Sequence, residues 1–299
     1  MTDFKRPNVV PVIMGVLNVT PDSFSDGGQF FDPDRAVQRG LAMAAEGAGI
    51  IDVGPESTRP GADEVSADEQ CRRAVPVIRA LREVLPDVTL SIDTRSAVVA
   101  DRAIEAGASI INDVSALRDD PEMVDVARSQ DVTVVIMHRR GTSQTMQQGG
   151  GPTYEDVVDD VRSFLDKRKQ ELVAEGVKQD RIWLDPGIGF GKRVEHNVAL
   201  LGRLEKIVSL GSPVLVGASR KRFIGSILGE AMPETCDEPE ARLPGSLACA
   251  IWAARSGASV IRVHDVRETL AAMNVWQHLE GSAGGEVGGT DVGRTRGLV

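Results

Sequence analysis

Residues 89–112 read TLSIDTRSAVVADRAIEAGASIIN, and the order of apolar and polar residues in this stretch decides the fold. A short strand-like run, Thr89 to Ile92, is followed by an amphipathic stretch from Ser96 to Ala106. Gly107-Ala108 and a second apolar run, Ser109 to Asn112, come next. Strand, helix and strand in this order are typical of a βα unit in a parallel sheet. The glycine tolerates the left-handed conformation in which a helix ends and turns back toward the sheet.

The same unit recurs along the chain. Eight strands are predicted, at Val12 to Leu17, Ile50 to Val53, Thr89 to Ile92, Ser109 to Asn112, Thr133 to Met137, Ile182 to Leu184, Val214 to Val216 and Val260 to Val263. Helices are predicted between and after them, at Pro33 to Glu46, Ala67 to Leu85, Ser96 to Ala106, Pro121 to Ser129, Tyr154 to Glu175, Glu195 to Ser209, Arg220 to Leu228 with Glu240 to Ser256, and Arg267 to Leu279. Eight such units favour a closed barrel over an open doubly wound sheet. The predicted fold is therefore α/β, a single-domain (β/α)8 TIM barrel.

One catalytic domain is expected over residues 1–280. The segment 281–299 is rich in Gly, Ser and Thr and has no apolar period, so we expect a disordered tail there. A chain of 299 residues with 41% hydrophobic content is long enough to bury the core of such a barrel.

The charge and the cysteines exclude several classes of protein. A formal net charge of -10 argues against a nucleic-acid partner, because binding to a phosphate backbone needs a basic surface. Any anionic ligand must therefore be held by local positive charge. Cys71, Cys236 and Cys249 fit neither a disulfide framework nor a zinc site, which favours a reducing cytoplasm. No stretch reaches the ~20 apolar residues of a membrane span.

Polar residues follow the predicted strands at one end. They are Asn18, Asp52, Asp93, Asn112-Asp113, His138, Asp185, Ser219-Arg220-Lys221, and Arg262 with His264. In a barrel of this kind, the residues at the carboxyl ends of the strands form the active site. Taken alone, Asp93 or Asp113 could equally be the N-cap of the next helix. Because every strand supplies such a group, the set as a whole predicts a polar ligand site.

Seven runs of sequence, in this order, resemble the dihydropteroate synthase family. They are GVLNVTPDSFSDGG (15–28), ESTRPG (56–61), SIDT (91–94), INDV (111–114), DPGIGFGK (185–192), SRK (219–221) and RVHD (262–265). The resemblance covers about Val12 to Gln277. Three places depart from the family pattern: Pro55 stands where the family usually has a second Gly, Ala116 stands where it often has Gly, and Arg139-Arg140 is more basic than the usual sequence after His138.

The resemblance implies a transferase of folate biosynthesis. Such an enzyme condenses 6-hydroxymethyl-7,8-dihydropterin diphosphate with 4-aminobenzoate, giving 7,8-dihydropteroate and diphosphate, and is a target of sulfonamides. It implies Mg2+ as the cofactor, small-molecule substrates as the partners and a homodimer as the assembly.

A pterin presents a flat edge with an amino group, a ring N–H and a carbonyl. Asp185 can accept two parallel hydrogen bonds from this edge, and Lys221 can donate to the carbonyl and a ring nitrogen. Asn112, which both donates and accepts, suits the remaining ring nitrogens. Asp93 is similar to the family carboxylate that also contacts the pterin. The resemblance assigns catalysis to Asp93, Lys221 and Arg262.

The other two parts of the site follow from the resemblance. The residues implied to bind the diphosphate are Asn18, Thr58, Arg262 and His264, with Asn18 as the ligand of Mg2+. For 4-aminobenzoate they are Phe24, Arg59, Phe190 and Ser219. Three alternatives stay open: an ion pair of Arg262 with Asp265 or Glu268, a simple surface position for His264, and packing under a loop for Phe190.

An arylamine is itself the nucleophile, so the reaction needs no serine or cysteine nucleophile. Catalysis would come from stabilising the departing diphosphate and a cationic pterin methylene, and from positioning the amine. The main alternative is a non-catalytic pterin-binding paralogue. Pterin binding alone needs no site for a diphosphate, so this alternative is opposed by the joint presence of Asn18, Arg59, Lys221, Arg262 and His264. A pterin-binding methyltransferase domain would need a corrinoid partner, and a Schiff-base aldolase would use Lys221.

Overall fold

Eight parallel strands form the centre of the fold. The computed structural model describes residues 10–20, 32–57, 64–141, 153–231 and 238–283. The strands are β1 (Val12–Asn18), β2 (Ile50–Gly54), β3 (Thr89–Asp93), β4 (Ile110–Asp113), β5 (Thr133–Met137), β6 (Ile182–Asp185), β7 (Leu215–Val216) and β8 (Val260–Val263). Each end lies within one residue of the predicted position.

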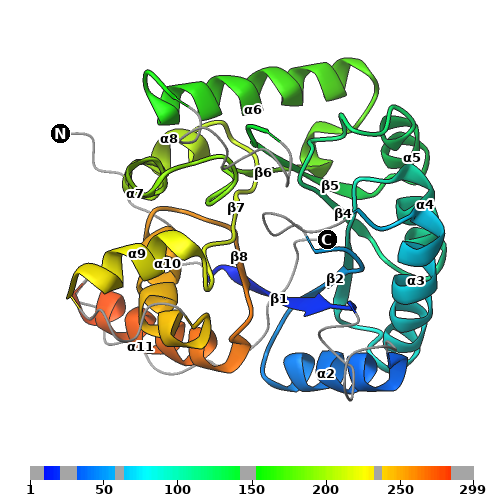
Figure 1. The fold of residues 1–299 in the computed structure, drawn as a ribbon, viewed down its shortest axis with the longest axis horizontal. Helices are drawn as coiled ribbons and strands as arrows, with labels where there is room; N and C mark the ends of the chain where they lie inside the picture. The colour runs from blue at the N-terminus through cyan, green and yellow to red at the C-terminus, as the bar shows by residue number, and fades with distance from the viewer. Residues whose placement is uncertain (1–9, 21–31, 58–63, 142–152, 232–237, 284–299) are drawn as a thin grey trace.

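The strands close into a barrel. Their order in the sheet is β6-β5-β4-β3-β2-β1-β8-β7. A parallel bridge between Leu184 and Val214 joins the two edges, and the Leu184 N–H donates to the Pro213 carbonyl at 2.9 Å. Helices surround the strands on all sides (Figure 1). The predicted (β/α)8 barrel is confirmed.

The helices lie between successive strands and after the last one. They are α2 (Pro33–Ala45), α3 (Ala67–Val84), α4 (Ala97–Glu105), α5 (Met123–Ser129), α6 (Val157–Ala174), α7 (Val194–Gly202), α8 (Glu205–Val208), α9 (Arg222–Ala231), α10 (Leu243–Arg255) and α11 (Val266–Ala283), with short 3-10 turns η2 (Gln179–Arg181) and η4 (Glu240–Arg242). None of these helices is both long and apolar enough to cross a membrane.

Several predicted helices need correction. α5 begins at Met123 and not at Pro121, α6 begins at Val157 and not at Tyr154, and residues 240–242 form the 3-10 turn η4 before α10. The element predicted from Glu195 to Ser209 is not continuous, because Arg203, with φ −126° and ψ 33°, separates α7 from α8. The glycine before it is a poor helix former. The helix predicted to begin at Arg220 begins two residues later, since Arg220 has a φ of 58°.

The C-terminal helix is longer than the sequence indicates. α11 continues to Ala283, three residues into the segment predicted to be a tail. Residues 284–299 lie outside the described part of the chain. The disorder predicted for them stays a prediction.

An apolar layer inside the barrel supports a polar layer above it. Side chains on a strand alternate between the two faces, so residues two apart point the same way. One inner cluster consists of Met14, Ile50, Ile110, Val135, Leu215 and Val260, with Val12 and Trp183 against it. Two positions further along the strands stand Asp52, Asn112, Asp185 and Arg262. The register pairs Asp52 with Ser91 and Asp93 with Asn112, so the polar groups meet at the carboxyl ends of the strands.

The alternate strand residues face the helices. Leu17, Ile51, Ile92, Ile111 and Ile136 are almost completely buried in the cluster that joins strands to helices. This outer core holds each strand in place and so fixes the positions of the polar groups at its end.

Candidate active site

A buried ionic group occupies the centre of the polar layer. Arg262, on β8, donates from Nε to Asp52 Oδ2 at 2.7 Å and from Nη2 to Asp93 Oδ2 at 2.8 Å. Asp52 also accepts from Ser91 Oγ at 2.6 Å and from Asn112 Nδ2 at 3.0 Å. The partners of Arg262 are thus Asp52 and Asp93, so the alternative of an ion pair with Asp265 or Glu268 is wrong.

Burial makes Asp93 easier to protonate than an ordinary aspartate. Burial raises the pKa of Asp93 to about 7; the charge of Arg262 opposes this shift, while that of Asp52 adds to it. Asp93 is not the N-cap of the following helix, because that cap is Ser96 and the Ala97 N–H donates to Asp120. The N-cap alternative for Asp93 is therefore wrong.

Asp113, the next strand-end carboxylate, has a local role. It accepts from Ser115 N, Ser115 Oγ and Leu117 N at 2.6, 2.9 and 3.0 Å. This turn contains Ala116 and Leu117 with φ 59° each, a left-handed conformation that costs free energy in residues other than glycine. The departure at Ala116 therefore places a non-glycine residue in a strained turn that Asp113 holds.

Asp185 and Lys221 lie on the opposite side of the same layer. Asp185 Oδ1 accepts from the Gly187 N–H at 2.7 Å, and burial raises the pKa of Asp185 while the charge of Lys221 opposes that shift. Burial lowers the pKa of Lys221 to about 8, although Asp185 favours its charged form. Arg262 also influences both pKa values, so the cation between Asp52 and Asp93 belongs to the same site.

The Phe190 ring lies beside Lys221. The Lys221 Nζ donates to the Ile188 carbonyl and lies 4.5 Å from the centre of the Phe190 ring. Gly189, with φ 84°, lets this loop pass the Lys221 side chain, which a Cβ there would meet at 2.9 Å. Phe190 therefore lies beside Lys221, a charged residue of the site. This position is compatible both with packing under the loop and with the predicted contact with 4-aminobenzoate.

Lys192 ends one of the seven motifs, and the sequence alone assigns it no role. Its Nζ lies 3.0 Å from His138 Nδ1, and it donates to the carbonyls of His138 and Phe190 at 3.1 Å each. Burial, together with the charge of Lys192, lowers the pKa of His138 to about 2. A Cβ at Gly187 would collide with the His138 carbonyl. The glycine in this motif is therefore the feature of the sequence that could have indicated the close approach of the two loops. Lys192 thus joins the ends of β5 and β6.

Ser219 and His264 form a pair at the ends of β7 and β8. Ser219 Oγ lies 3.1 Å from His264 Nδ1, and the His264 N–H donates to Ser219 Oγ at 3.2 Å. Because His264 is partly buried and bound to Ser219, the alternative of a simple surface histidine is wrong. The neighbouring Arg220 points elsewhere and binds Asp265 through two hydrogen bonds, at 3.0 and 2.6 Å.

Asn18 lies at the end of β1 next to β2. A Cβ built on Gly54 would lie 3.4 Å from Asn18 Oδ1 and 3.9 Å from Asp93 Cβ, so this glycine allows the two residues to approach. Within the described ranges, no group of three or more His, Cys, Asp or Glu residues could hold a metal ion. Three predicted site residues, Phe24, Thr58 and Arg59, lie outside the described residues.

Comparison with known proteins identifies the family. A family model described as pterin binding enzyme matches residues 14–264. The chain is 46% identical over 268 residues to dihydropteroate synthase of Haemophilus influenzae, covering 90% of this chain and 94% of that protein. It is 45% identical over 275 residues to the Mycobacterium leprae protein of the same name, covering 91% and 95%. The chain belongs to the pterin binding enzyme family, among the dihydropteroate synthases.

Solved structures of this family have the same fold. A dihydropteroate synthase from Xanthomonas albilineans with 4-aminobenzoic acid matches with a TM-score of 0.82 and 44% identity, over 91% of this chain and 94% of that one. The Xanthomonas albilineans enzyme in complex with 7,8-dihydropteroate matches with a TM-score of 0.80 and 40% identity, over 92% and 95%. The family predicted from the seven motifs is confirmed.

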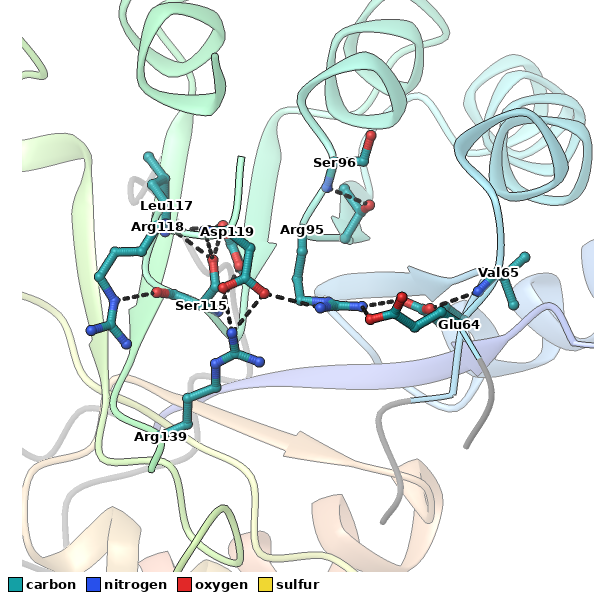
Figure 2. A network of polar contacts seen from close by, with 12 residues as sticks. Glu64, Val65, Arg95, Ser96, Ser115, Leu117, Arg118, Asp119 and Arg139 are labelled. Carbon is teal, nitrogen blue, oxygen red and sulfur yellow. Dashed lines mark hydrogen bonds and ion pairs between the residues drawn. The ribbon is translucent and has the colours of Figure 1, made fainter. Parts of the chain in front are cut away.

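One departure from the family pattern takes part in a network of ion pairs at the rim (Figure 2). Arg139 pairs with Asp119, and Asp119 accepts from Arg95 Nη1 at 2.9 Å. Arg95 Nη2 reaches Glu56 Oε2 at 3.2 Å, and Glu56 Oε1 accepts the Val65 N–H at 2.9 Å. Single surface ion pairs contribute little, whereas this network joins the segments after β2, β3, β4 and β5. Arg140 pairs separately with Asp160, at 3.0 Å, so both arginines of this basic pair have carboxylate partners.

Proposed function

We infer that this chain joins 6-hydroxymethyl-7,8-dihydropterin diphosphate to 4-aminobenzoate and releases 7,8-dihydropteroate and diphosphate in folate biosynthesis. Relatives that match about nine tenths of the chain are named for this activity, so the predicted enzyme is confirmed and a non-catalytic paralogue is not favoured. The structural observation that carries the inference is the set of buried carboxylates and partly buried cations at one end of the barrel. Its members are Asp52, Asp93, Asp185, Lys221 and Arg262.

The pterin ring is proposed to lie between Asp185 and Asp93. Asp185 would accept from the amino group and a ring N–H, with its carboxylate oriented by the Gly187 N–H. Lys221 would donate to the carbonyl and a ring nitrogen, and Asn112 would contact the remaining ring nitrogens. This end of the site has the acceptors and donors that a pterin edge requires.

The diphosphate is proposed to lie nearer the rim. Arg262 uses Nε and Nη2 for its two carboxylates, and its Nη1 takes part in neither bond. His264 lies beside Ser219 at the same end of the barrel. Arg262 would supply the local positive charge that a protein of net charge -10 needs to bind this anion, and His264, Asn18 and Thr58 would add polar contacts.

Mg2+ is the proposed cofactor. The proposed ligand is the side-chain amide oxygen of Asn18, and the described residues contain no group of three or more His, Cys, Asp or Glu that could form an all-protein cage. Such a site fits Mg2+, which keeps several waters and is commonly bound by few protein ligands together with substrate phosphates. The ion would neutralise charge on the diphosphate as it leaves.

The second substrate, 4-aminobenzoate, is proposed to bind beside Phe190 and Ser219. Phe190 is fixed by Lys192 and Lys221, and Ser219 is fixed by His264. A related enzyme of known structure carries 4-aminobenzoic acid. The contributions of Phe24 and Arg59 stay predictions from the sequence.

The chemistry requires charge stabilisation and positioning more than proton transfer. As the C–O bond to diphosphate breaks, positive charge develops on the pterin methylene, and Asp93 and Asp185 hold the ring from which it comes. Arg262 and His264 stabilise the departing diphosphate. Diphosphate leaves with the electron pair of the C–O bond, the amine nitrogen forms the new C–N bond, and its proton passes to water.

The activity is tested by mixing the purified chain with both substrates and measuring 7,8-dihydropteroate, with Mg2+ and with a chelator. We expect product with Mg2+ and little without it. Failure to form product with Mg2+ present would contradict the proposed function, whereas equal rates in the two conditions would contradict only the metal.

The activity should have a narrow pH optimum. Asp93 can act purely as an acceptor for the donors of the pterin only when it is ionised. Activity should therefore rise as the pH passes the pKa of Asp93, which is about 7. Lys221 loses its charge above its pKa of about 8, so activity should fall there. Because kcat/KM reports the pKa values of the free enzyme, its value for the pterin diphosphate should follow a bell-shaped curve.

Two variants test whether Asp93 and Lys221 cause the acidic and alkaline limbs of that curve. Asp93→Asn should remove the acidic limb, and Lys221→Arg, whose guanidinium stays charged, should remove the alkaline limb. If both variants keep the wild-type curve, other groups control the pH dependence.

A homodimer and a cytoplasmic location are also proposed. α11 exposes Val275 and Leu279, one helical turn apart, which suits contact with a second copy. Cys71 and Cys249 are free thiols, which suits a reducing compartment.

A further inference from the structure

Asp52 is a central residue of the polar layer to which the motifs assign no role. Its exposed fraction is 0%, and it accepts hydrogen bonds from side chains on three other strands. Ser91 Oγ donates to Oδ1 at 2.6 Å, whereas Asn112 Nδ2 and Arg262 Nε both donate to Oδ2, at 3.0 and 2.7 Å. Two groups assigned to the substrate therefore meet at a single oxygen atom.

The first consequence concerns Asn112. A carboxylate oxygen accepts hydrogen bonds, so the part of the Asn112 amide that faces Asp52 must be its NH2 group. The amide oxygen is then directed away from Asp52 and offers an acceptor there. Without Asp52, half a turn about the last side-chain bond would exchange donor and acceptor at little steric cost.

The second consequence concerns Arg262. Its guanidinium is planar, and two anchors fix the plane: Asp52 on Nε and Asp93 on Nη2 at 2.8 Å. With the Asp93 anchor alone, the group could rotate about the remaining hydrogen bond, and Nη1 would lose its fixed direction.

We propose that Asp52 is a positioning residue that holds the Asn112 amide and the Arg262 guanidinium in the orientation required by the pterin diphosphate. Asp52 acts through these two residues and does not contact the substrate. Because the roles of Asn112 and Arg262 come from the proposed function, this proposal rests on that function. Groups that orient a binding residue from behind commonly change activity by about 10- to 100-fold when removed.

Asp52→Ala tests the proposal. We expect kcat/KM for the pterin diphosphate to fall by about 10- to 100-fold, with a raised KM for that substrate. Asp52→Asn should recover most of the loss, because its carbonyl oxygen can face Arg262 and Asn112 while its NH2 group donates to Ser91 Oγ. If Asp52→Asn is as impaired as Asp52→Ala, the negative charge matters and positioning is refuted.

Ser91→Ala is the matched control. It removes an equally buried hydrogen bond to Asp52 but leaves both bonds to Oδ2, so KM for the pterin diphosphate should stay within about threefold of wild type. A loss of folded protein lowers kcat and leaves KM unchanged, which separates positioning from a purely structural role. The wild-type enzyme in the same assay separates a failure of this proposal from a failure of the proposed function.

If Asp52→Ala does not fold, the wild-type protein still allows a test. The side-chain amide protons of Asn112, assigned in nuclear magnetic resonance spectra with an Asn112→Ser variant, should exchange slowly with solvent in the unliganded protein. Exchange as fast as that of a free amide would mean that Asp52 does not hold Asn112, and the proposal would be abandoned.

Discussion

Replacing Asp185 with asparagine should weaken binding of the pterin substrate by about 2–4 kcal/mol, or roughly 30- to 1,000-fold in affinity. Asp185 Oδ1 accepts the Gly187 N–H at 2.7 Å, so the oxygen of an asparagine would stay on that N–H. Its NH2 group would then face the pterin edge, which presents donors of its own. Two donors cannot satisfy each other, and both would be left buried without a partner.

Isothermal titration calorimetry with a pterin lacking phosphates measures this effect without turnover. The matched control is Asp113→Asn, since Asp113 is also a buried strand-end carboxylate but binds only its own turn through Ser115 and Leu117. We expect that control to lose stability and to keep its pterin affinity. Unchanged affinity in Asp185→Asn, or equal losses in the two variants, would remove Asp185 from the pterin site.

Much of this site could be predicted because the barrel has a simple period. Strand ends are visible in the sequence, and parallel strands bring their carboxyl ends to one rim, so Asp93, Asp185 and Arg262 could be placed there without coordinates. The alternation of side chains then decides which of them face inward. Asp113 follows an inward-facing residue by one position, and in the structure it accordingly binds its own turn instead of the polar layer.

Partner choice could not be predicted in the same way. From the sequence, nearby Asp265 or Glu268 were the alternative carboxylate partners of Arg262, whereas Asp52 and Asp93, on β2 and β3, take that place. Residues distant in sequence meet only through the strand register and the closure of the barrel, which local patterns do not contain. Lys192 was missed for a related reason, because its contacts with His138 depend on how closely two loops approach.

Replacing Arg262 with alanine should destabilise the fold and abolish binding of the intact substrate. Arg262 is the cation between Asp52 and Asp93, whose exposed fractions are 0% and 7%. Removal of one partner from a buried ion pair commonly costs about 3–5 kcal/mol, because the remaining charge is neither solvated nor paired. Here two carboxylates would be left, so we expect a loss of unfolding free energy in this range, measured by urea denaturation near pH 8.

The pH dependence of this loss separates an electrostatic cause from lost packing. In the wild type the pKa of Asp93 is already raised to about 7 by burial, and without the opposing charge of Arg262 it should rise further. A carboxyl group whose pKa is higher in the folded than in the unfolded state binds its proton more tightly when folded. Its favourable contribution is therefore full below the unfolded pKa and is lost as pH rises through the folded pKa. Lowering the pH from 8 to 5 should consequently restore part of the stability of Arg262→Ala, and more than it adds to the wild type.

Arg220→Ala provides the comparison, since Arg220 lies at the neighbouring strand end but pairs with Asp265 and with the more exposed Glu240. That variant should lose no more than ~1 kcal/mol, since one of its partners can be solvated by water. At pH 5 it should gain no more stability than the wild type gains, because it leaves the carboxylates of the polar layer paired. Equal losses in the two variants at every pH would mean that Arg262 stabilises the barrel by packing alone. The charge balance among Asp52, Asp93 and Arg262 would then have to be rejected as the basis of the site.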